Sequence, residues 1–111
     1  MLAISQKLLD AQSVDETAVA TPAAFEQSGC NMAVHTIEWG TGVSAGVVEI
    51  EAAPSSTYSG TWANLGTITY ASGSPHAVTF VTSGPYKALR HRISTAISGG
   101  TVTTSINGEC A

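Results

Sequence analysis

Charged residues are scarce in this sequence of 111 amino acids. Asp, Glu, Lys and Arg together make up 11% of it, whereas about 25% is usual for a globular domain. Only four residues are Lys or Arg, and the formal net charge is −4. Proteins that bind a phosphate backbone need clustered Lys and Arg side chains. The composition therefore argues against nucleic acid as a partner.

Long hydrophobic runs are also missing. No stretch approaches the roughly 18 apolar residues that a membrane-spanning helix needs. The first residues, from Met1 to Ile4, have no basic segment, and Lys7 and Asp10 interrupt the apolar run that a signal peptide would contain. We therefore expect a protein without a membrane partner that is made and folded in a cytoplasm.

Cysteines number only two, Cys30 and Cys110. Neither has a second cysteine or a histidine at the spacing of a metal site. Thiols in a cytoplasm are usually kept reduced, so we expect both to be free. A bond between them would instead close a long loop and hold the C-terminus down, and the sequence leaves that choice open.

Motifs of catalysis and of phosphate binding are absent as well. Gly-x-Ser-x-Gly, which marks a nucleophilic serine, does not occur, and no glycine-rich stretch opens a helix. The three histidines, His35, His76 and His91, lie in separate predicted strands and are interpreted as core or surface histidines. We predict a protein that is not an enzyme and that holds neither a cofactor nor a metal.

One pair of carboxylates has a spacing that deserves comparison with catalytic pairs. Glu49 and Glu51 share one face of a predicted strand, about 6–7 Å apart along it, which is near the separation in glycosidases. Such enzymes need one member of the pair desolvated in a cleft, so that its pKa rises. We interpret Glu49 and Glu51 instead as a solvated acidic face.

What the sequence does contain is a series of short apolar runs separated by turn residues. The most distinct run extends from Gly46 to Glu51, where Val48 and Ile50 alternate with polar residues. A polar turn follows at 52–60, and a second run begins at Trp62. Alternation with a period of two is typical of half-buried strands, and Gly66 within the second run indicates a bulge.

The whole chain divides into about eight such runs, with turn signals every 8–12 residues or so. They cover residues 4–12, 17–20, 31–39, 46–51, 62–70, 76–82, 86–95 and 101–107. This pattern predicts an all-β fold, a single antiparallel β-sandwich that is jelly-roll-like, with an Ig-like sandwich as the alternative. Residues 1–12 form an N-terminal arm or first strand, 13–107 the sandwich, and 108–111 a C-terminal tail. The predicted inward side chains are Ala33, His35, Ile37, Trp39, Val48, Ile50, Val78, Phe80, Leu89, His91, Ile93, Val102, Thr104 and Ile106.

Two surfaces of this predicted sandwich are candidates for binding. Arg90 and Arg92 project from one strand face and can meet an acidic surface of a neighbouring subunit; the alternative is that they are two solvated surface arginines. Tyr58 and Trp62 can form a stacking platform for a sugar, although aromatic residues at such places more often pack across a hairpin or at an interface.

The order of the motifs resembles that of a family, the small jelly-roll or Ig-like structural proteins encoded in the morphogenesis clusters of tailed phages. The resemblance rests on segments 46–51 (GVVEIE), 62–65 (WANL), 86–94 (YKALRHRIS) and 98–103 (SGGTVT). It covers about residues 46–107. Two features depart from the family pattern: the turn at 54–60 lacks Asp-Gly, and His91 stands where a small residue is usual.

The resemblance implies a virion structural protein, a capsid decoration (cement) protein on the outer surface of the capsid, made in the cytoplasm of the host. Its partners would be the major capsid protein and copies of itself in a homotrimer, and it would brace the shell by adding interface area. Under this hypothesis residues 1–12 contact the shell or a neighbour, with Ile4, Lys7 and Leu8 at the interface. The alternatives are a module associated with a tail or fibre, and a carbohydrate-binding β-sandwich.

Overall fold

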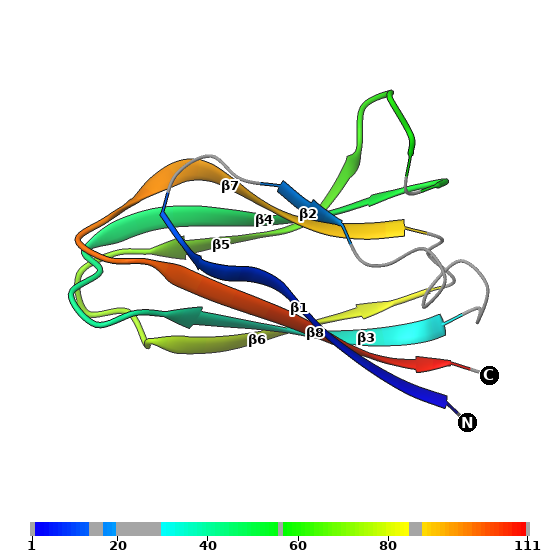
Figure 1. The fold of residues 1–111 in the computed structure, drawn as a ribbon, viewed down its shortest axis with the longest axis horizontal. Helices are drawn as coiled ribbons and strands as arrows, with labels where there is room; N and C mark the ends of the chain where they lie inside the picture. Colours follow the sequence, from blue (N-terminus) through cyan, green and yellow to red (C-terminus); the bar gives the residue numbers. More distant parts are fainter. Residues whose placement is uncertain (1, 14–16, 20–29, 56, 85–87, 111) are drawn as a thin grey trace.

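Eight strands make up the computed structural model, which describes residues 2–13, 17–19, 30–55, 57–84 and 88–110. They form two four-stranded sheets that pack face to face as a sandwich (Figure 1). Sheet A has the strand order β1-β8-β3-β6 and sheet B the order β2-β7-β4-β5. The strands are β1 (Leu2–Gln12), β2 (Thr17–Val19), β3 (Cys30–Trp39), β4 (Ala45–Ala53), β5 (Ala63–Tyr70), β6 (Ala77–Ser83), β7 (Ala88–Ser98) and β8 (Val102–Cys110).

The strand pairing is nested about the connection between β4 and β5. These two strands pair with each other in sheet B, β3 with β6 in sheet A, β2 with β7 in sheet B, and β1 with β8 in sheet A, all antiparallel. A long hairpin rolled into two sheets in this way is the topology of a jelly roll. The predicted jelly-roll sandwich is therefore confirmed, and the strand order is not that of the Ig-like alternative.

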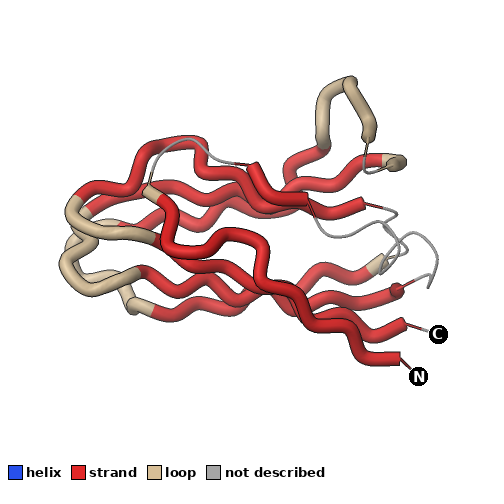
Figure 2. Tube along the Cα trace, in the orientation of Figure 1, coloured by secondary structure: helices blue, strands red, loops and turns tan. Residues whose placement is uncertain are grey.

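The core lies between the two layers of strands that Figure 2 shows. Side chains at alternate positions of the central strands fill it, as the alternation in the sequence predicted. The rings of Trp39 and Tyr70 are 5.5 Å apart near one end. Its members with less than a tenth of their surface exposed include Leu9, Ile37, Trp39, Val48, Ile50, Tyr70, Ile93, Ile97 and Val102.

Two bulges explain where the alternation in the sequence fails. Lys7 pairs with Ser105 and Leu9 with Thr104, so Leu8 is an extra residue on β1. The extra residue explains why the adjacent Leu8 and Leu9 interrupt the period-two alternation of a strand. Ile50 pairs with Gly66 and Glu51 with Asn64, so the bulge predicted in β5 is present.

The two ends of the chain lie side by side in sheet A (Figure 1). Residues 2–12 form a strand that pairs with β8, so the first-strand interpretation describes them. The predicted tail at 108–111 is wrong for residues 108–110, which belong to β8 and pair with both β1 and β3. These residues continue the strand because they have a partner strand on either side.

The same register places the two cysteines opposite each other. Cys30 of β3 is the register partner of Cys110 of β8. Opposed residues in antiparallel strands have Cα atoms about 4.5–5.5 Å apart, within the range that a disulfide bridges. The spacing of the two strands therefore allows a disulfide between these cysteines. Whether the thiols are free depends on the redox state of the compartment.

At the other end of the sandwich, two loops are held against each other by backbone contacts. Gly40 N–H donates to the Thr101 carbonyl at 2.7 Å, and Ser44 N–H donates to the Ser98 carbonyl at 2.9 Å. Gly99 lies between these bonds with a φ of +84°, and a Cβ placed on it would overlap the Gly42 carbonyl oxygen. Glycine is needed there both for its backbone conformation and for space.

We predict that Gly99→Ala lowers the free energy of unfolding by about 2–4 kcal/mol, because strain at a positive φ adds to an overlap with backbone that cannot move aside. Gly73→Ala is the matched control, since Gly73 has a φ of +92° but nothing within 4 Å of an added Cβ. It should cost about 1–2 kcal/mol. Urea unfolding measures both, and equal losses would contradict the contact between the loops.

Candidate functional site

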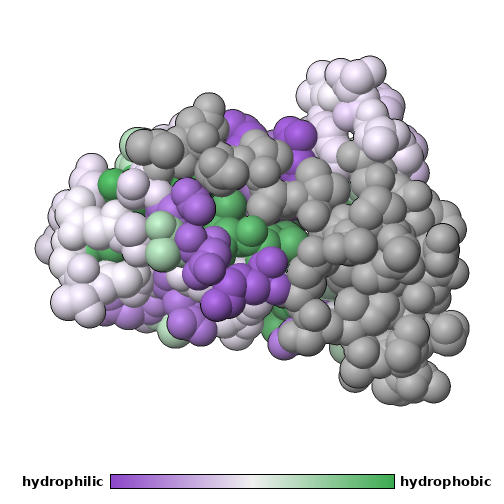
Figure 3. Space-filling view, viewed as in Figure 1, coloured by the Kyte–Doolittle hydropathy of each residue, from purple (hydrophilic) through white to green (hydrophobic). Residues whose placement is uncertain are grey.

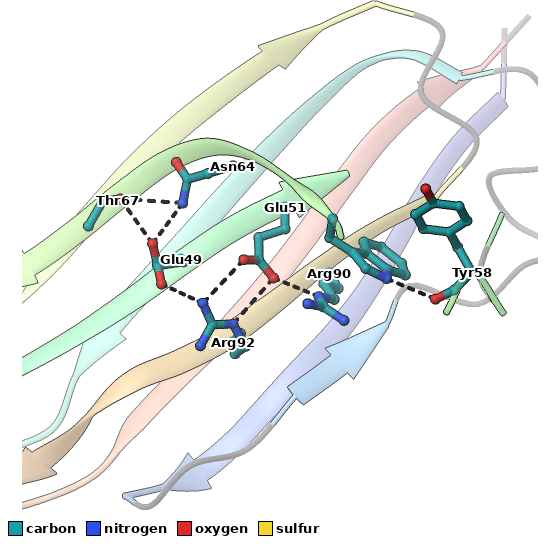
Figure 4. Close-up of polar contacts among 8 residues, drawn as sticks. Glu49, Glu51, Tyr58, Asn64, Thr67, Arg90 and Arg92 are labelled. Carbon is teal, nitrogen blue, oxygen red and sulfur yellow. Dashed lines mark hydrogen bonds and ion pairs between the residues drawn. The ribbon is translucent and has the colours of Figure 1, made fainter. Parts of the chain in front are cut away.

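The outward face of sheet B carries a ladder of ion pairs. Glu49 and Glu51 on β4 are the register partners of Arg92 and Arg90 on β7. Arg90 Nε donates to Glu51 Oε1 at 2.7 Å, and Arg92 Nη2 donates to Glu49 Oε2 at 2.7 Å and to Glu51 Oε2 at 3.3 Å. The dashed lines in Figure 4 trace these bonds. Two carboxylates and two guanidinium groups thus balance each other within one chain.

Residues of the neighbouring strand β5 complete this ladder on the side of Glu49. Asn64 Nδ2 donates to Glu49 Oε1 at 2.8 Å, and the Thr67 hydroxyl lies 3.4 Å from the same oxygen (Figure 4). Each carboxylate oxygen of Glu49 therefore has a hydrogen-bond donor. The polar face extends across three strands, β5, β4 and β7.

Glu51 is buried, which the sequence did not indicate. Only 5% of its surface is exposed. Burial alone raises the pKa of the carboxyl, but hydrogen bonds and positive charge from Arg92 and Arg90 outweigh that effect and leave the pKa below its ordinary value. The prediction of a solvated acidic face is wrong for Glu51, because it treated the glutamates and the arginines as separate surfaces.

Trp62 lies against Arg90 at the other end of the ladder. The guanidinium carbon of Arg90 lies 4.3 Å from the centre of the Trp62 ring, in the geometry of a cation–π contact. The indole N–H donates to the carbonyl of Tyr58 at 3.1 Å, and Trp62 is only 7% exposed. Tyr58 itself is 41% exposed and lies on the loop between β4 and β5, which stands out from the sandwich in Figure 3.

The structure therefore brings four of the predicted site residues together, from two competing predictions. Arg90 and Arg92, expected at a protein interface, lie beside Trp62 and Tyr58, expected under the sugar-binding alternative. Arg90 covers one face of the Trp62 ring. The signal in the sequence was the matched spacing of Glu-x-Glu in one strand and Arg-x-Arg in another, which places opposite charges in register.

The remaining predicted residues lie elsewhere. Ile4, Lys7 and Leu8 belong to β1, an edge strand of sheet A. Lys7 is exposed, and its ammonium is 3.7 Å from Asp10, while Leu8 is half-buried at the bulge. Their role at an interface stays a prediction.

A second polar cluster crosses the core of the sandwich. His35 of β3 and His91 of β7 are both fully buried, and Nδ1 of His35 lies 2.7 Å from Nε2 of His91. His35 Nε2 is 3.0 Å from the Thr82 hydroxyl, and His91 Nδ1 is 2.7 Å from that of Thr104. The backbone N–H of Leu9 donates to Thr104 Oγ1 at 3.2 Å. We call this series the histidine chain.

One arrangement of protons satisfies every member of the histidine chain while both rings stay neutral. Thr104 accepts from Leu9 and donates to His91 Nδ1, His91 Nε2–H donates to His35 Nδ1, and His35 Nε2–H donates to Thr82. Among the residues described, every buried side-chain nitrogen and oxygen has a partner. The chain therefore stabilises the core without leaving an unpaired polar group.

Burial makes both rings hard to protonate. It lowers the pKa of His35 to about 4. Burial, and then the charge of His35, lowers the pKa of His91 to about 3. Only one hydrogen fits between the two facing nitrogens, so two imidazolium rings would break their bond. The sequence placed both histidines inward, as the structure confirms, but gave no sign that they meet.

Metal binding and membrane insertion were also expected to be absent. Within the described ranges, no group of three or more His, Cys, Asp or Glu side chains is placed to hold a metal ion. In the same part of the chain there is no helix that is long and apolar enough to cross a membrane.

Comparison with known proteins identifies the fold. The jelly roll is similar to the crystal structure of the SPBc2 prophage-derived protein YomS, with a TM-score of 0.68 and 7% identity over 96% of this chain and 93% of that one. It is also similar to the PBSX exported protein XepA, with a TM-score of 0.55 and 12% identity over 97% of this chain. That match spans 37% of the XepA chain.

A third structure with the same arrangement comes from Bacillus endospore appendages, described as a family of disulfide-linked pili. Its TM-score is 0.52, with 19% identity over 98% of this chain and 89% of the other. No family model and no curated protein matches the sequence. At these identities the comparisons establish the fold alone.

The ion-pair ladder predicts a graded response to loss of charge. Glu51→Gln should lower the free energy of unfolding by about 2–4 kcal/mol, because it leaves two partly buried arginines with a single countercharge. Asp10→Asn, which removes the exposed partner of Lys7, should change it by less than about 0.5 kcal/mol. Chemical unfolding at neutral pH measures both. A small loss for Glu51→Gln would show that the ladder is not a stabilising network.

The histidine chain predicts that acid weakens the fold. Because the pKa of each ring is lower in the folded chain than the value of 6.5 in the unfolded chain, the unfolded state binds more protons below pH 6.5. Stability is therefore complete above pH 6.5 and falls toward pH 4, by up to about 1.4 kcal/mol per pH unit for each histidine. Unfolding in urea between pH 7 and pH 5 measures the slope, before most carboxylates titrate.

The double variant His35→Leu/His91→Leu is the control for this slope. It removes both titrating rings, and its stability should change little over the same range of pH. If the slope of the double variant equals that of the wild type, other groups are responsible for the acid sensitivity.

Proposed function

We propose that this chain is a non-enzymatic structural protein of a phage virion, and specifically a capsid decoration (cement) protein. It would bind the outer surface of the capsid, bridge subunits of the major capsid protein, and associate with copies of itself. Neither a cofactor nor nucleic acid takes part. Stabilisation comes from added interface area, which the symmetry of the shell multiplies.

The observation that carries this proposal is the match to YomS along nearly the whole of both chains. The prophage-derived protein YomS is of similar extent and has a similar fold, and the PBSX exported protein XepA contains a similar domain. Fold alone does not specify function. The sequence motifs at 46–51, 62–65, 86–94 and 98–103 point independently to the same class of structural protein.

The chemistry of the described side chains supports a structural role. The two buried histidines are bonded to each other and to threonines, and the buried carboxylate of Glu51 is bonded to two arginines. These groups stabilise packing between and along the sheets. Each would have to give up its partners before it could act on a substrate.

The surface of sheet A near β1 is the side that we propose for the capsid. Lys7 is exposed there, whereas Arg90 and Arg92 already neutralise carboxylates of their own chain. Arg90 and Arg92 would contribute to an interface through the ladder as a whole, which presents a balanced polar face. Ile4 and Leu8 belong to the same strand as Lys7.

Co-sedimentation of the pure protein with empty capsids of the phage that encodes it tests the proposal. We expect binding that saturates at a fixed ratio to the major capsid protein. Lys7→Glu should weaken it about tenfold by reversing an exposed charge at the interface. Thr69→Glu, which adds a negative charge to an exposed position on β5, should leave it unchanged. Protein that stays in the supernatant at every concentration would refute the decoration role.

The tail- or fibre-associated alternative uses the same sandwich, and co-sedimentation with purified tails distinguishes it. The carbohydrate-binding alternative has less support. Arg90 covers Trp62, and of the two aromatic residues only Tyr58 is substantially exposed.

A further inference from the structure

The β6 edge of sheet A lacks the features that usually prevent an edge strand from pairing with another chain. β6 (Ala77–Ser83) pairs with β3 and with no other strand that the structure describes. Its alternate residues Ala77, Thr79, Val81 and Ser83 are exposed, and Val81 has 53% of its surface accessible. An unpaired strand of this kind presents free backbone N–H and C=O groups to another chain.

The three other edge strands are protected. β1 carries Lys7 and Asp10 and has two register shifts, β2 is only three residues long, and β5 is interrupted by the bulge at Leu65. Charges, short length and bulges are the usual means by which natural sheets avoid pairing at their edges. β6 contains no charge, proline or glycine, and its pairing with β3 runs without a register shift.

We propose that β6 is an interaction surface, and that it pairs antiparallel with the β6 strand of a second copy of this chain about a two-fold axis. The proposal rests on the self-association included in the proposed function and names the surface that carries it. Two copies of sheet A would become one continuous sheet of eight strands. The contact is isologous, so each copy offers the same residues.

A pairing centred on Phe80 matches the strand onto itself over its full length. Ala77 then faces Ser83 of the second copy, and Thr79 faces Val81 of the second copy. On β3, the register places Val34 beside Val81 and Met32 beside Ser83. Val34, Val81 and the exposed Met32 would therefore extend a row of apolar side chains across the joint.

Electrostatics does not oppose this contact, because β6 carries no charge. Each chain carries a net charge of −4, so most approaches of two copies bring like charges together. Glu38 on β3 is exposed and is the register partner of Ala77. In the two-fold arrangement the two Glu38 side chains lie at opposite ends of the joint, about 20 Å apart along the strands, beyond the screening length at physiological salt.

A two-fold contact predicts a dimer, whereas the resemblance to decoration proteins implied a trimer. The position of β6 at an edge of sheet A permits the dimer. Rotation about an axis perpendicular to the sheet makes the two β6 strands antiparallel and keeps the same face of sheet A outward in both copies. The partner that this edge recognises is thus an uncharged strand of seven residues with the same sequence.

A matched pair of substitutions tests the contact. Thr79 on β6 and Thr69 on β5 are both exposed threonines on edge strands, so Thr79→Lys and Thr69→Lys make the same chemical change on different edges. The mass of the full chain in solution is measured over a wide range of concentration. We expect a concentration-dependent dimer that Thr79→Lys weakens about tenfold or more, since two like charges then meet across the joint, and that Thr69→Lys leaves intact.

Hydrogen exchange locates the contact independently of these variants. Backbone N–H groups of β6 that do not face β3 should exchange rapidly in dilute protein and slowly at high concentration, while exchange in β5 stays constant. A single-chain mass at every concentration would overturn the proposal. So would an oligomer, trimer included, in which exchange in β6 does not change with concentration.

Capsid binding is measured separately. A monomer that still sediments with capsids would refute the β6 contact and leave the decoration role intact. A β6 dimer that does not sediment with capsids would support the β6 contact and refute the decoration role. A strand of another virion protein seated on β6 would protect the strand only when that protein is added, and this too would overturn pairing between copies.

Discussion

The bond between His35 and His91 is the contact that ties the two sheets of this sandwich together in a specific alignment. Apolar packing between sheets tolerates small shifts, because it depends on volume more than on direction. A hydrogen bond of 2.7 Å between two buried rings does not tolerate such shifts. A shift would leave polar atoms without partners in the protein interior, where an unpaired polar atom is destabilising. The histidine chain links β1, β8, β7, β3 and β6 and so fixes strands of both sheets relative to one another.

The two outward faces of the sandwich differ because their charges are distributed differently. Sheet B concentrates two glutamates and two arginines in register, and they satisfy one another. Sheet A presents mostly Thr, Ser and Val side chains on its outward positions. Four of the 12 charged residues of the chain lie in the one face of sheet B. The uncharged part of the face of sheet A, along β6, is able to meet another protein surface without the cost of desolvating ions.

The sequence predicted correctly those features that depend on a single strand. Alternation identified which side chains of β3, β7 and β8 point inward, including both histidines, and Gly66 indicated the bulge in β5. The sequence did not predict features that depend on which two strands are neighbours. The ladder, the histidine chain and the pairing of Cys30 with Cys110 each depend on strand order, and periodicity within a strand contains no information on its neighbours. The burial of Glu51 was missed for the same reason, because its partners lie on β7.

The nested order of the strands also has a consequence for the way the chain acquires its fold. The pair at the centre, β4 and β5, is local, but β1 meets its partner β8 only after every other strand has been made. Contacts between segments so far apart in the chain form slowly, since the loop they close is long. During synthesis, sheet A therefore stays incomplete until the ribosome has released the C-terminal strand. Until then β3 has only β6 beside it, and His35 has no complete core in which to meet His91.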